Sequence, residues 1–393
     1  MLIHMPKEVQ SILTTLSNAG HAAYIVGGCV RDSLINILPK DWDIATSAQP
    51  NEIKAAFPHT VDTGIAHGTV TVVLHRQNYE VTTFRIDGTY LDSRHPEEVT
   101  FTTDIEEDLS RRDFTINAIA YNPATGLVDP FNGLEDISRK TIRCVGHAPS
   151  RFTEDALRMM RAIRFSAQLG FAIDPDTCKA IAPLSERLGH ISIERIREEF
   201  TKILSSTNPG ALSLLNETNL WPQILRGLPF QGNLSQAIPW LKQCPKRPAM
   251  LYALLLAGEV FMRHLKFDTR TSKEAALYTH WLYKHISSER YEVKKALNII
   301  GAYQLNNLLL LKEITQPENQ PHWKAIHIIC EDILKSGECF TLKDLAIDGQ
   351  TLITAGIPSG KNMGQIIAQL LDMVMVDPAL NQKDTLLEIA LNL

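Results

Sequence analysis

Two aspartates, Asp41 and Asp43, carry the first sign of chemistry in the sequence. They lie in KDWDIAT, a segment of strand character, so we expect both carboxylates on one face of a strand and Trp42 and Ile44 on the other. Such a pair suits divalent metal ions, because hard cations prefer oxygen ligands and can activate an attacking hydroxyl while stabilising a leaving phosphate. A solvated strand end would carry the same two residues, so the pair alone does not decide.

A glycine pair precedes the aspartates. Gly28 closes HAAYIVGG, which is typical of a strand ending in a glycine turn, and Arg31 lies one turn into the helix predicted for CVRDSLIN. Glycines let backbone N–H groups approach a phosphate, and an arginine adds charge-assisted hydrogen bonds. A glycine pair alone can be a simple turn. Its combination with Arg31 and the two aspartates in one strand, turn, helix and strand unit is far more specific.

A further group of charged residues lies in TEDALRMMRAIRF. We predict a helix here, with Thr153 as its N-cap, because the acidic residues that follow Thr153 favour the positive end of a helix dipole. The apolar residues recur at helical spacing and predict one buried face, formed by Leu157, Met160, Ile163 and Ala167.

Asp155 and Arg158 are three residues apart, so they are neighbours on this predicted helix. One interpretation is an intrahelical ion pair. The other rests on base edges, because cytosine and adenine present an exocyclic amine beside an unprotonated ring nitrogen, whereas uracil and guanine present a carbonyl beside a ring N–H. A carboxylate accepts from the amine and a guanidinium donates to the ring nitrogen, so the pair would accept C and A and reject U and G. Arg161 and Arg164 could add contacts to a nucleotide or fix the pair.

The composition is that of a globular protein of 393 residues, long enough for two or more domains. A net charge of −5 argues against a protein that coats nucleic acid indiscriminately, but basic residues gather between Arg139 and Lys202 and could form a local groove.

The sequence has no apolar run of about 18 residues and no secretion signal at its N-terminus, which predicts a cytoplasmic location and no membrane contact. Six cysteines without zinc-ligand spacing predict reduced thiols.

The elements that must position these residues change character along the chain. Up to about residue 145, strand and helix signals alternate, and TVTVVL and YEVTTFRI predict a β-hairpin. From Thr153 onward the periodicity is helical throughout. We therefore predict the α+β class, with an N-terminal mixed domain followed by an all-helical remainder.

Four motifs together resemble a known family. GGCVRDSL, KDWDIAT, RRDFTINA at 111–118 and EDALRMMRAIRF at 154–165 are similar to the class II tRNA nucleotidyltransferases and bacterial poly(A) polymerases of the DNA polymerase β superfamily. The resemblance implies a DNA polymerase β-like nucleotidyltransferase head at 1–145, a base-recognising neck at 146–205, a helical body at 206–300 and a helical, tRNA-binding tail at 301–393.

The resemblance also implies residue roles. The residues that would contact the nucleotide are Gly28, Arg31, Arg112, Asp155, Arg158, Arg161 and Arg164, with Gly28 and Arg31 at the triphosphate. Asp41 and Asp43 would be catalytic and would bind Mg²⁺.

Two of the implied roles have alternatives. Arg112 could instead form a salt bridge with Asp108 or Asp113. Many enzymes of the superfamily place a third carboxylate on a neighbouring strand, for which Glu80 in YEVTTFR is our candidate, with an exposed strand glutamate as the alternative.

The implied reaction adds and repairs the 3′-terminal CCA of tRNA. The tRNA 3′-hydroxyl would attack the α-phosphate of CTP or ATP without a nucleic-acid template, and pyrophosphate would leave. The stretch DGTYLDSRHPEEV, with Asp92 and Arg94 near its middle, resembles the flexible loop of members that add the terminal A, which argues against an enzyme that adds only CC.

Three alternatives to CCA addition stay open. An enzyme that adds only the final A and a poly(A) polymerase belong to the same branch, although the chain lacks a long basic extension that would help to hold arbitrary RNA. A noncatalytic RNA-binding protein of the same fold is the third alternative, and the intact Asp41 and Asp43 argue against it. The sequence does not predict the oligomeric state.

Overall fold

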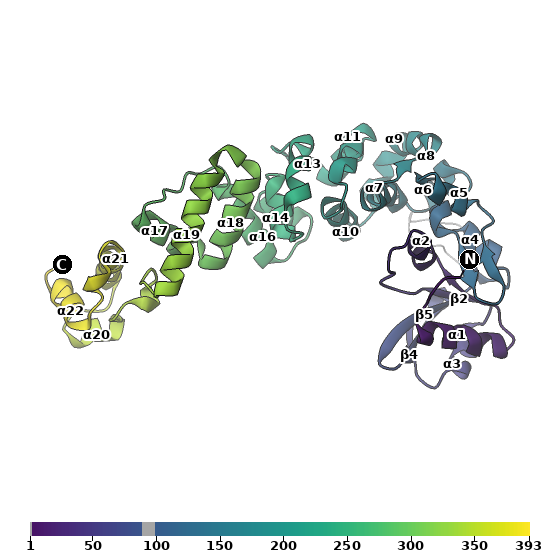
Figure 1. The fold of residues 1–393 in the computed structure, drawn as a ribbon, viewed down its shortest axis with the longest axis horizontal. Coiled ribbons are helices and arrows are strands. Elements are labelled where there is room, and N and C mark those ends of the chain that lie inside the picture. The colour runs from purple at the N-terminus through teal and green to yellow at the C-terminus, as the bar shows by residue number, and fades with distance from the viewer. Residues whose placement is uncertain (1, 89–98) are drawn as a thin grey trace. The chain divides into compact units, whose positions relative to one another are not determined.

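The computed structural model describes residues 2–88 and 99–393. The chain forms two compact units, Met1–Phe230 and Gln231–Leu393, which we call unit 1 and unit 2. All three sheets of the described chain lie in unit 1, and helices form the rest (Figure 1). The predicted α+β class, with a mixed N-terminal domain followed by helices, is confirmed.

A seven-stranded sheet organises the N-terminal part of unit 1, with the strand order β3-β4-β5-β2-β1-β8-β9. The predicted hairpin is present as antiparallel β4 and β5, joined by His75 and Arg76. Both turn residues have positive φ, as tight two-residue hairpin loops require. The strands are β1 (Ala23–Val26), β2 (Ile44–Thr46), β3 (Thr60–Gly64), β4 (Thr69–Leu74), β5 (Gln77–Thr83), β8 (Ala120–Asn122) and β9 (Gly126–Val128).

The strand that follows the two aspartates, β2, lies inside the sheet between antiparallel β1 and parallel β5. All three of its residues are buried, which fits the short, apolar and β-branched sequence IAT. The parallel register pairs Ile44 with Val81. The residues just before β2 therefore lie beside the residues just before Val81.

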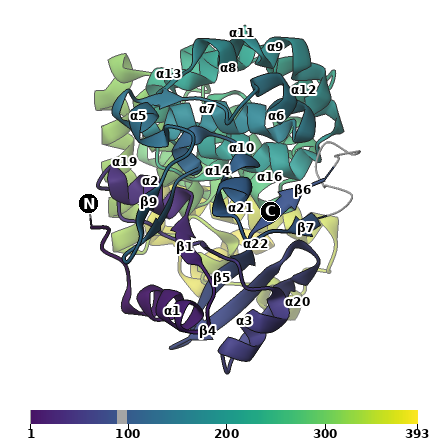
Figure 2. The same cartoon turned by 90° about the vertical axis from the view of Figure 1, so that its right-hand side faces the viewer.

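Helices α1 (Lys7–Asn18) and α3 (Pro50–Ala56) pack against each other and against this sheet (Figure 2). The buried residues of α1 are Val9, Ile12, Leu13 and Leu16, which follow the spacing of one helix face. They join the core of the N-terminal part of unit 1.

Short elements complete that part, namely α2 (Gly28–Leu34), α4 (Ile105–Ser110), α5 (Gly133–Ser138), β10 (Thr141–Ile142) and the 3₁₀ turns η1 (Ile65–His67) and η2 (Thr115–Asn117).

The strands β6 (Arg85–Asp87) and β7 (Val99–Phe101) precede and follow the segment 89–98 in the chain, and they pair as an antiparallel two-stranded sheet. Asp92 and Arg94, which the sequence places in the loop for terminal A addition, lie outside the described residues.

The helical part of unit 1 corrects one expectation. TEDALRMMRAIRF is not a single helix capped by Thr153, but is divided between α6 (Ala148–Glu154) and α7 (Leu157–Leu169). Thr153 lies in the last turn of α6, where its hydroxyl donates to the carbonyl of Pro149 at 2.8 Å. Asp155 has extended backbone angles and accepts from the N–H of Leu157 at 3.0 Å, so Asp155 satisfies the start of α7 in place of Thr153.

The predicted apolar face of α7 is confirmed, because Leu157, Met160, Ile163 and Ala167 are all buried. Helix α7 packs along α10 (Ile193–Leu204). The other elements of this part are β11 (Ala172–Ile173), α8 (Pro175–Lys179), α9 (Ile181–Leu184), η3 (Ser185–His190), η4 (Pro209–Ser213), α11 (Leu214–Glu217) and α12 (Trp221–Leu225).

Unit 2 is helical, as predicted. Its α-helices are α13 (Leu234–Gln243), α14 (Pro248–Leu254), α15 (Glu259–His264), α16 (Thr269–Trp281), α17 (Arg290–Ile300), α18 (Ala302–Thr315), α19 (Gln320–Ser336), α20 (Gly349–Thr354), α21 (Lys361–Val376) and α22 (Lys383–Leu391). Residues from Cys339 to Ala390 share a hydrophobic core cluster of their own. The units divide after Phe230, not at the expected neck–body boundary of 205, so the four-part division stays a prediction.

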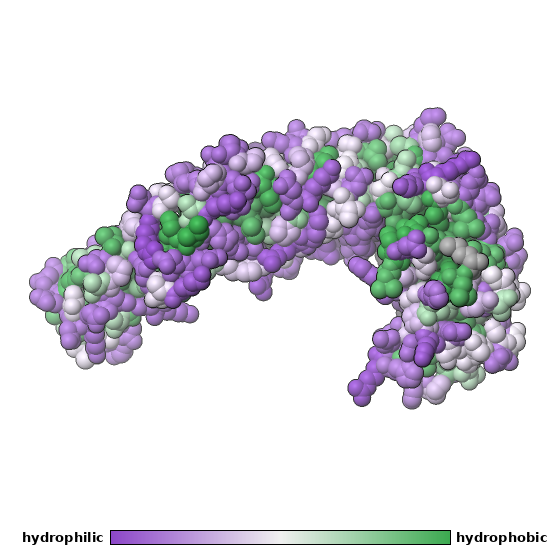
Figure 3. Space-filling view, in the orientation of Figure 1, coloured by the Kyte–Doolittle hydropathy of each residue, from purple (hydrophilic) through white to green (hydrophobic). Residues whose placement is uncertain are grey.

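On the face seen in Figure 3, hydrophilic residues cover most of unit 2, and hydrophobic residues form separate patches between them. No helix in the described part of the chain combines the length and the apolar character needed to cross a bilayer.

Candidate active site

The turn between β1 and α2 holds the glycine pair. Gly27 has a φ of 75°, in the region that favours glycine, and its N–H donates to the carbonyl of Ile119 at 3.1 Å. Helix α2 begins at Gly28, which leaves the first N–H groups of the helix without intrahelical partners. Arg31 is buried on the same helix. The local geometry is therefore suited to an anion.

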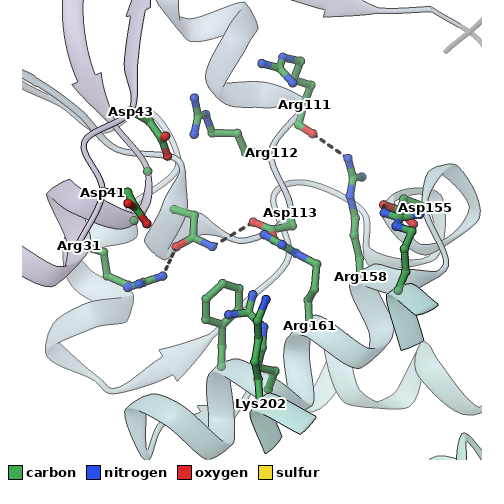
Figure 4. A pocket seen from close by; sticks show the side chains of 16 residues that line it. Arg31, Asp41, Asp43, Arg111, Arg112, Asp113, Asp155, Arg158, Arg161 and Lys202 are labelled. Carbon is green, nitrogen blue, oxygen red and sulfur yellow. Dashed lines mark hydrogen bonds and ion pairs between the residues drawn. The ribbon is translucent and has the colours of Figure 1, made fainter. Parts of the chain in front are cut away.

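One cavity of about 600 Å³ in unit 1 collects all the residues predicted to contact the nucleotide or Mg²⁺, apart from the candidate Glu80 (Figure 4). Eight of its lining side chains are basic and four are acidic. The excess of positive charge suits a polyanionic ligand such as a nucleoside triphosphate. The charged and glycine residues that line it are Gly27, Gly28, Arg31, Asp41, Asp43, Arg111, Arg112, Asp113, Asp155, Arg158, Arg161, Arg164, Arg195 and Lys202.

Asp41 and Asp43 line this cavity, while Ile44 is buried in the hydrophobic core and the partly buried Trp42 packs against that core. The predicted alternation is therefore present in the segment just before β2, where the N–H of Val26 donates to the carbonyl of Asp43 at 3.0 Å. Among the described residues, neither aspartate has a basic ion-pair partner within 4.0 Å. Burial raises the pKa of Asp43, the guanidinium of Arg112 opposes this, and the charge of Asp41 adds to it.

Two adjacent carboxylates without a cationic partner fit a divalent cation, because its charge would relieve their repulsion and their oxygens are the ligands it prefers. No cluster of three or more histidine, cysteine or acidic side chains with metal-binding geometry occurs in the described residues. A cation held by the two aspartates would therefore have room for oxygens from a ligand.

Glu80 lies close to the pair in the sheet. Because Ile44 is paired with Val81 in a parallel register, Glu80 is the neighbour of Asp43 one residue before that pair. Glu80 is exposed and lines a second cavity, of about 800 Å³, together with Asp41 and Asp43. The role of Glu80 as a third carboxylate stays a prediction.

A hydrogen-bonded chain connects Arg31 to the far side of the cavity. Nη1 of Arg31 donates to Oδ1 of Asn117 at 2.5 Å, and Nδ2 of Asn117 donates to Oδ1 of Asp113 at 3.0 Å. Nη2 of Arg161 lies 2.5 Å from Oδ2 of Asp113. Burial would raise the pKa of Asp113, but Arg161, the Asn117 amide and Arg158 outweigh it and lower the pKa to about 2. This carboxylate is therefore ionised and fixes guanidinium groups on one side of the site.

Arg112 combines the two interpretations that its sequence motif allows. Its Nη2 lies 3.2 Å from Oδ2 of Asp108, so the predicted alternative of a salt bridge is present. Arg112 also lines the cavity and covers Gly27, where an added Cβ would lie only 2.8 Å from Nη1 of Arg112. Its Nε is buried and has no hydrogen-bond partner in the described chain. Asp108 therefore holds Arg112 in the cavity, and does not withdraw it from the site.

Asp155 and Arg158 form ion pairs with different partners. Oδ2 of Asp155 lies 3.0 Å from Nη2 of Arg195, whereas Nη1 of Arg158 lies 2.6 Å from Oε2 of Glu154. Nη2 of Arg158 also donates to the carbonyl of Arg111 at 2.9 Å (Figure 4). Both residues line the cavity, so an acceptor and a donor are presented to the same space.

Phe165, a residue without a predicted role, packs among three arginines. The guanidinium carbons of Arg164, Arg31 and Arg161 lie 4.0, 5.0 and 5.4 Å from the ring centroid. Cation–π contacts of this kind hold the side chains over an apolar surface. On its other side, Arg164 forms an ion pair with the buried carboxylate of Glu199.

Sequence reasoning missed Phe165 and Asn117 as site residues and named Arg195 and Lys202 only as part of a basic stretch. Phe165 is not one of the residues predicted for the apolar face of this helix, and only the proximity of the three arginines distinguishes it. Asn117 lies inside RRDFTINA, so the motif itself was the signal that could have found it.

Comparison with known protein families gives three matches in chain order. A model of the poly(A) polymerase head domain matches residues 23–143. A model of an RNA- and SrmB-binding site of polymerase A matches residues 170–231, and a model of tRNA nucleotidyltransferase domain 2 matches residues 249–390.

Individual proteins are similar over nearly the whole chain. A CCA-adding enzyme of Leuconostoc mesenteroides is 39% identical over 98% of this chain and 96% of its own length. A CCA-adding enzyme of Lactobacillus johnsonii is 37% identical over 97% of this chain and 96% of its own length. The crystal structure of the Bacillus stearothermophilus CCA-adding enzyme in complex with CTP superposes with a TM-score of 0.84, at 34% identity, and the match covers 99% of this chain and 98% of that one.

Proposed function

Since this chain belongs to the CCA-adding enzymes, a family of tRNA nucleotidyltransferases, we propose that the unit 1 cavity is its nucleotidyl-transfer site. The protein adds and repairs the 3′-terminal CCA of tRNA without a nucleic-acid template, and its substrates are tRNA, CTP and ATP. We also propose a cytoplasmic location for it.

In the proposed reaction, the tRNA 3′-hydroxyl attacks the α-phosphate of the nucleotide. The bond between the 3′-oxygen and the α-phosphorus forms, the bond from that phosphorus to the bridging oxygen of the β-phosphate breaks, and pyrophosphate leaves. Arg31 and Arg112, with the backbone at Gly28, bind and orient the triphosphate, because they line the cavity close to Asp41 and Asp43. Proximity of the bound groups supplies a large part of the acceleration in reactions of this type.

The family generally uses divalent metal ions, and we propose that Asp41 and Asp43 hold Mg²⁺. Neither aspartate has a basic ion-pair partner in the described part of the chain, and this absence and the raised pKa of Asp43 support the assignment. When bound, Mg²⁺ polarises phosphate oxygens and makes the attacking hydroxyl more acidic.

One observation carries the base-selection proposal. Asp155 and Arg158 line the same cavity as Asp41 and Asp43. Asp155 forms its ion pair with Arg195, and Arg158 forms its ion pair with Glu154. Asp155 can therefore accept from the exocyclic amine of C or A while Arg158 donates to the ring nitrogen. Arg161 and Arg164, which Asp113 and Glu199 hold, orient the nucleotide beside Phe165.

The rival functions fit the observations less well. The relatives that match nearly the full length are CCA-adding enzymes, whereas the similarity to the poly(A) polymerase head covers residues 23–143. A noncatalytic RNA-binding protein has no use for the paired Asp41 and Asp43, which line the cavity and have no basic ion-pair partner in residues 2–88 and 99–393.

Nucleotide selection tests the site assignment. Asp155→Ala removes the acceptor for the amine, and Arg158→Ala removes the donor to the ring nitrogen. We expect both variants to lose rate with CTP and ATP, and Asp155→Ala to lose discrimination against UTP and GTP, because an unpaired buried polar group typically costs about 1–3 kcal/mol. The readout is kcat/KM for all four nucleotides on a tRNA awaiting C and on one awaiting A. Wild-type discrimination in both variants at both steps would refute the assignment.

A further inference from the structure

Helix α10 contributes side chains to the side of the cavity where we propose that the base is selected. Arg195, Glu199 and Lys202 follow the spacing of one helix face, and this helix packs along α7. Arg195 and Lys202 line the cavity, where Figure 4 shows Lys202, and Glu199 holds Arg164. The face of α10 toward the cavity is therefore charged, and its charges contact residues that we assign to the nucleotide.

Arg195 fixes the carboxylate of Asp155 in one orientation. Nη2 of Arg195 donates to Oδ2 of Asp155 at 3.0 Å, and the N–H of Leu157 donates to Oδ1 at 3.0 Å. The carboxylate is thus held at both oxygens. Each oxygen can accept more than one hydrogen bond, so Asp155 keeps capacity for a ligand amine.

One donor group of Arg195 has no partner among the residues that the structure describes. Its Nη1 is buried and has no hydrogen-bond partner within the described chain, although Arg195 lines the cavity. Buried polar groups are rarely left unpaired in proteins, so such an arginine calls for an explanation. An arginine that served only to stabilise the helix packing would be expected to satisfy its donors there.

Asp155 and Arg158 are close in sequence and opposite in charge. Asp155 lies in the break between α6 and α7, Arg158 lies in the first turn of α7, and a direct pair between them would occupy the acceptor and the donor that read the base. Glu154 holds Arg158, and Arg195 holds Asp155. These outer partners leave the two reading groups directed to a ligand and not to one another.

We infer that Arg195 is a positioning residue for base selection. It holds the Asp155 carboxylate apart from Arg158, in the orientation that accepts the exocyclic amine of cytosine or adenine. This inference rests on the proposed function of Asp155 and adds a residue that acts through it.

The test compares Arg195→Ala with Arg197→Ala, a matched control on the same helix that does not line the cavity. Selectivity is measured as the ratio of kcat/KM for CTP over UTP on a tRNA awaiting C, and for ATP over GTP on a tRNA awaiting A. We expect Arg195→Ala to lower both ratios by roughly tenfold or more, since a misplaced acceptor forfeits a buried hydrogen bond. Arg197→Ala should leave the ratios unchanged, and Arg195→Lys should restore part of the loss because it keeps the charge. If Arg195→Ala does not fold, Arg195→Gln provides the same comparison.

A double-mutant cycle separates positioning from a general structural effect. Once Asp155→Ala has removed the carboxylate, adding Arg195→Ala should reduce selectivity no further. Unchanged selectivity in Arg195→Ala, or an equal loss with and without Asp155, would overturn the inference while leaving the role of Asp155 intact. Wild-type selectivity in Asp155→Ala itself would instead overturn the proposed function of that residue, and the inference with it.

Discussion

At the scale of single residues, most charges around the cavity are held by an opposite charge. Arg112, Arg158, Arg161 and Arg164 each contact a carboxylate of the protein. The two adjacent aspartates are the exception, since no basic side chain of the described chain lies within ion-pair distance of them. The protein therefore preorganises its donors and leaves one site of uncompensated negative charge, which is the arrangement that electrostatic catalysis with a bound cation requires.

The first prediction concerns this negative site. Asp43→Asn should lower kcat by roughly a thousandfold or more, because metal ligands supply several kcal/mol of transition-state stabilisation. Asp43 is exposed and has no basic ion-pair partner among the described residues, so the variant should melt close to wild type. Turnover and thermal melting are measured on the same preparations. Asp62→Asn, which removes a half-exposed carboxylate of the same sheet, is the control. Normal turnover in Asp43→Asn would remove it from the metal site.

The second prediction concerns Asp113 and pH. Its pKa is about 2 in the folded chain, below the usual value of about 3.9 in unfolded chains. A depressed carboxyl pKa contributes stability that is fully present above the unfolded value and is lost as pH falls through the folded value. Asp113→Asn should therefore cost on the order of 2 kcal/mol at neutral pH and flatten the loss of stability between these two pH values. Urea unfolding along a pH series measures both effects, and parallel curves for variant and wild type would contradict them.

At the scale of elements, the turn from β1 to α2 couples backbone geometry to the site. Gly27 is needed for its positive φ and for the space that Arg112 occupies above it. The two requirements can be separated, since Gly20 also has a positive φ, of 90°, but has no atom within 4 Å of an added Cβ.

This comparison gives the third prediction. Gly27→Ala and Gly20→Ala should both lower stability, by about 1–3 kcal/mol, because alanine is strained at positive φ. Only Gly27→Ala should weaken nucleotide binding, since its methyl group must displace Arg112, and we expect KM for CTP and for ATP to rise together. Thermal melting and steady-state kinetics give the two readouts. Equal KM values in the two variants would show that Arg112 does not depend on the turn.

The elements also show how far the sequence predicts this site. Periodicity and turn residues sufficed for the β4–β5 hairpin, the glycine turn and the common side of Asp41 and Asp43 in the segment before β2. They failed for the break between α6 and α7. Either Thr153 or Asp155 could accept a hydrogen bond from the first N–H groups of a helix, and the packing of that helix decides which one does. They also failed for Arg195, because which carboxylate an arginine pairs with is decided by tertiary structure, and helix spacing indicated Arg158 as the partner of Asp155.

At the scale of the whole molecule, the two units hold separate interactions. Every residue that lines the proposed nucleotide cavity belongs to unit 1. In unit 2, Glu338 contacts Arg290 and lies 2.6 Å from Nζ of Lys294, whose side chain is only 2% exposed. Nζ of Lys294 also donates to the carbonyl of Met375 at 3.0 Å, which connects α17 to α21. Hydrogen bonding by Arg290 lowers the pKa of Glu338 to about 2, against the effect of burial and with the help of Lys294.

The fourth prediction uses this contact to separate the units. Glu338→Gln should destabilise unit 2 by about 3 kcal/mol, because it leaves Lys294 as an uncompensated buried charge. Glu331→Gln, which breaks an exposed pair with Lys335, should cost less than about 1 kcal/mol. Denaturant unfolding measures the loss, and CTP binding measured below the unfolding transition should match wild type in both variants. Weakened CTP binding in Glu338→Gln would show that the nucleotide site depends on unit 2.

The most direct test of the central claim offers the purified wild-type protein three tRNAs, ending before CCA, after the first C and after CC. Each is incubated with Mg²⁺ and with each of the four nucleotides separately, and the products are resolved at single-nucleotide length. CCA addition predicts incorporation of C into the first and second tRNAs from CTP and of A into the third from ATP, with UTP and GTP rejected at every step. Failure to add C to the first tRNA would contradict the account, and incorporation of A alone into the third would identify an A-adding enzyme instead.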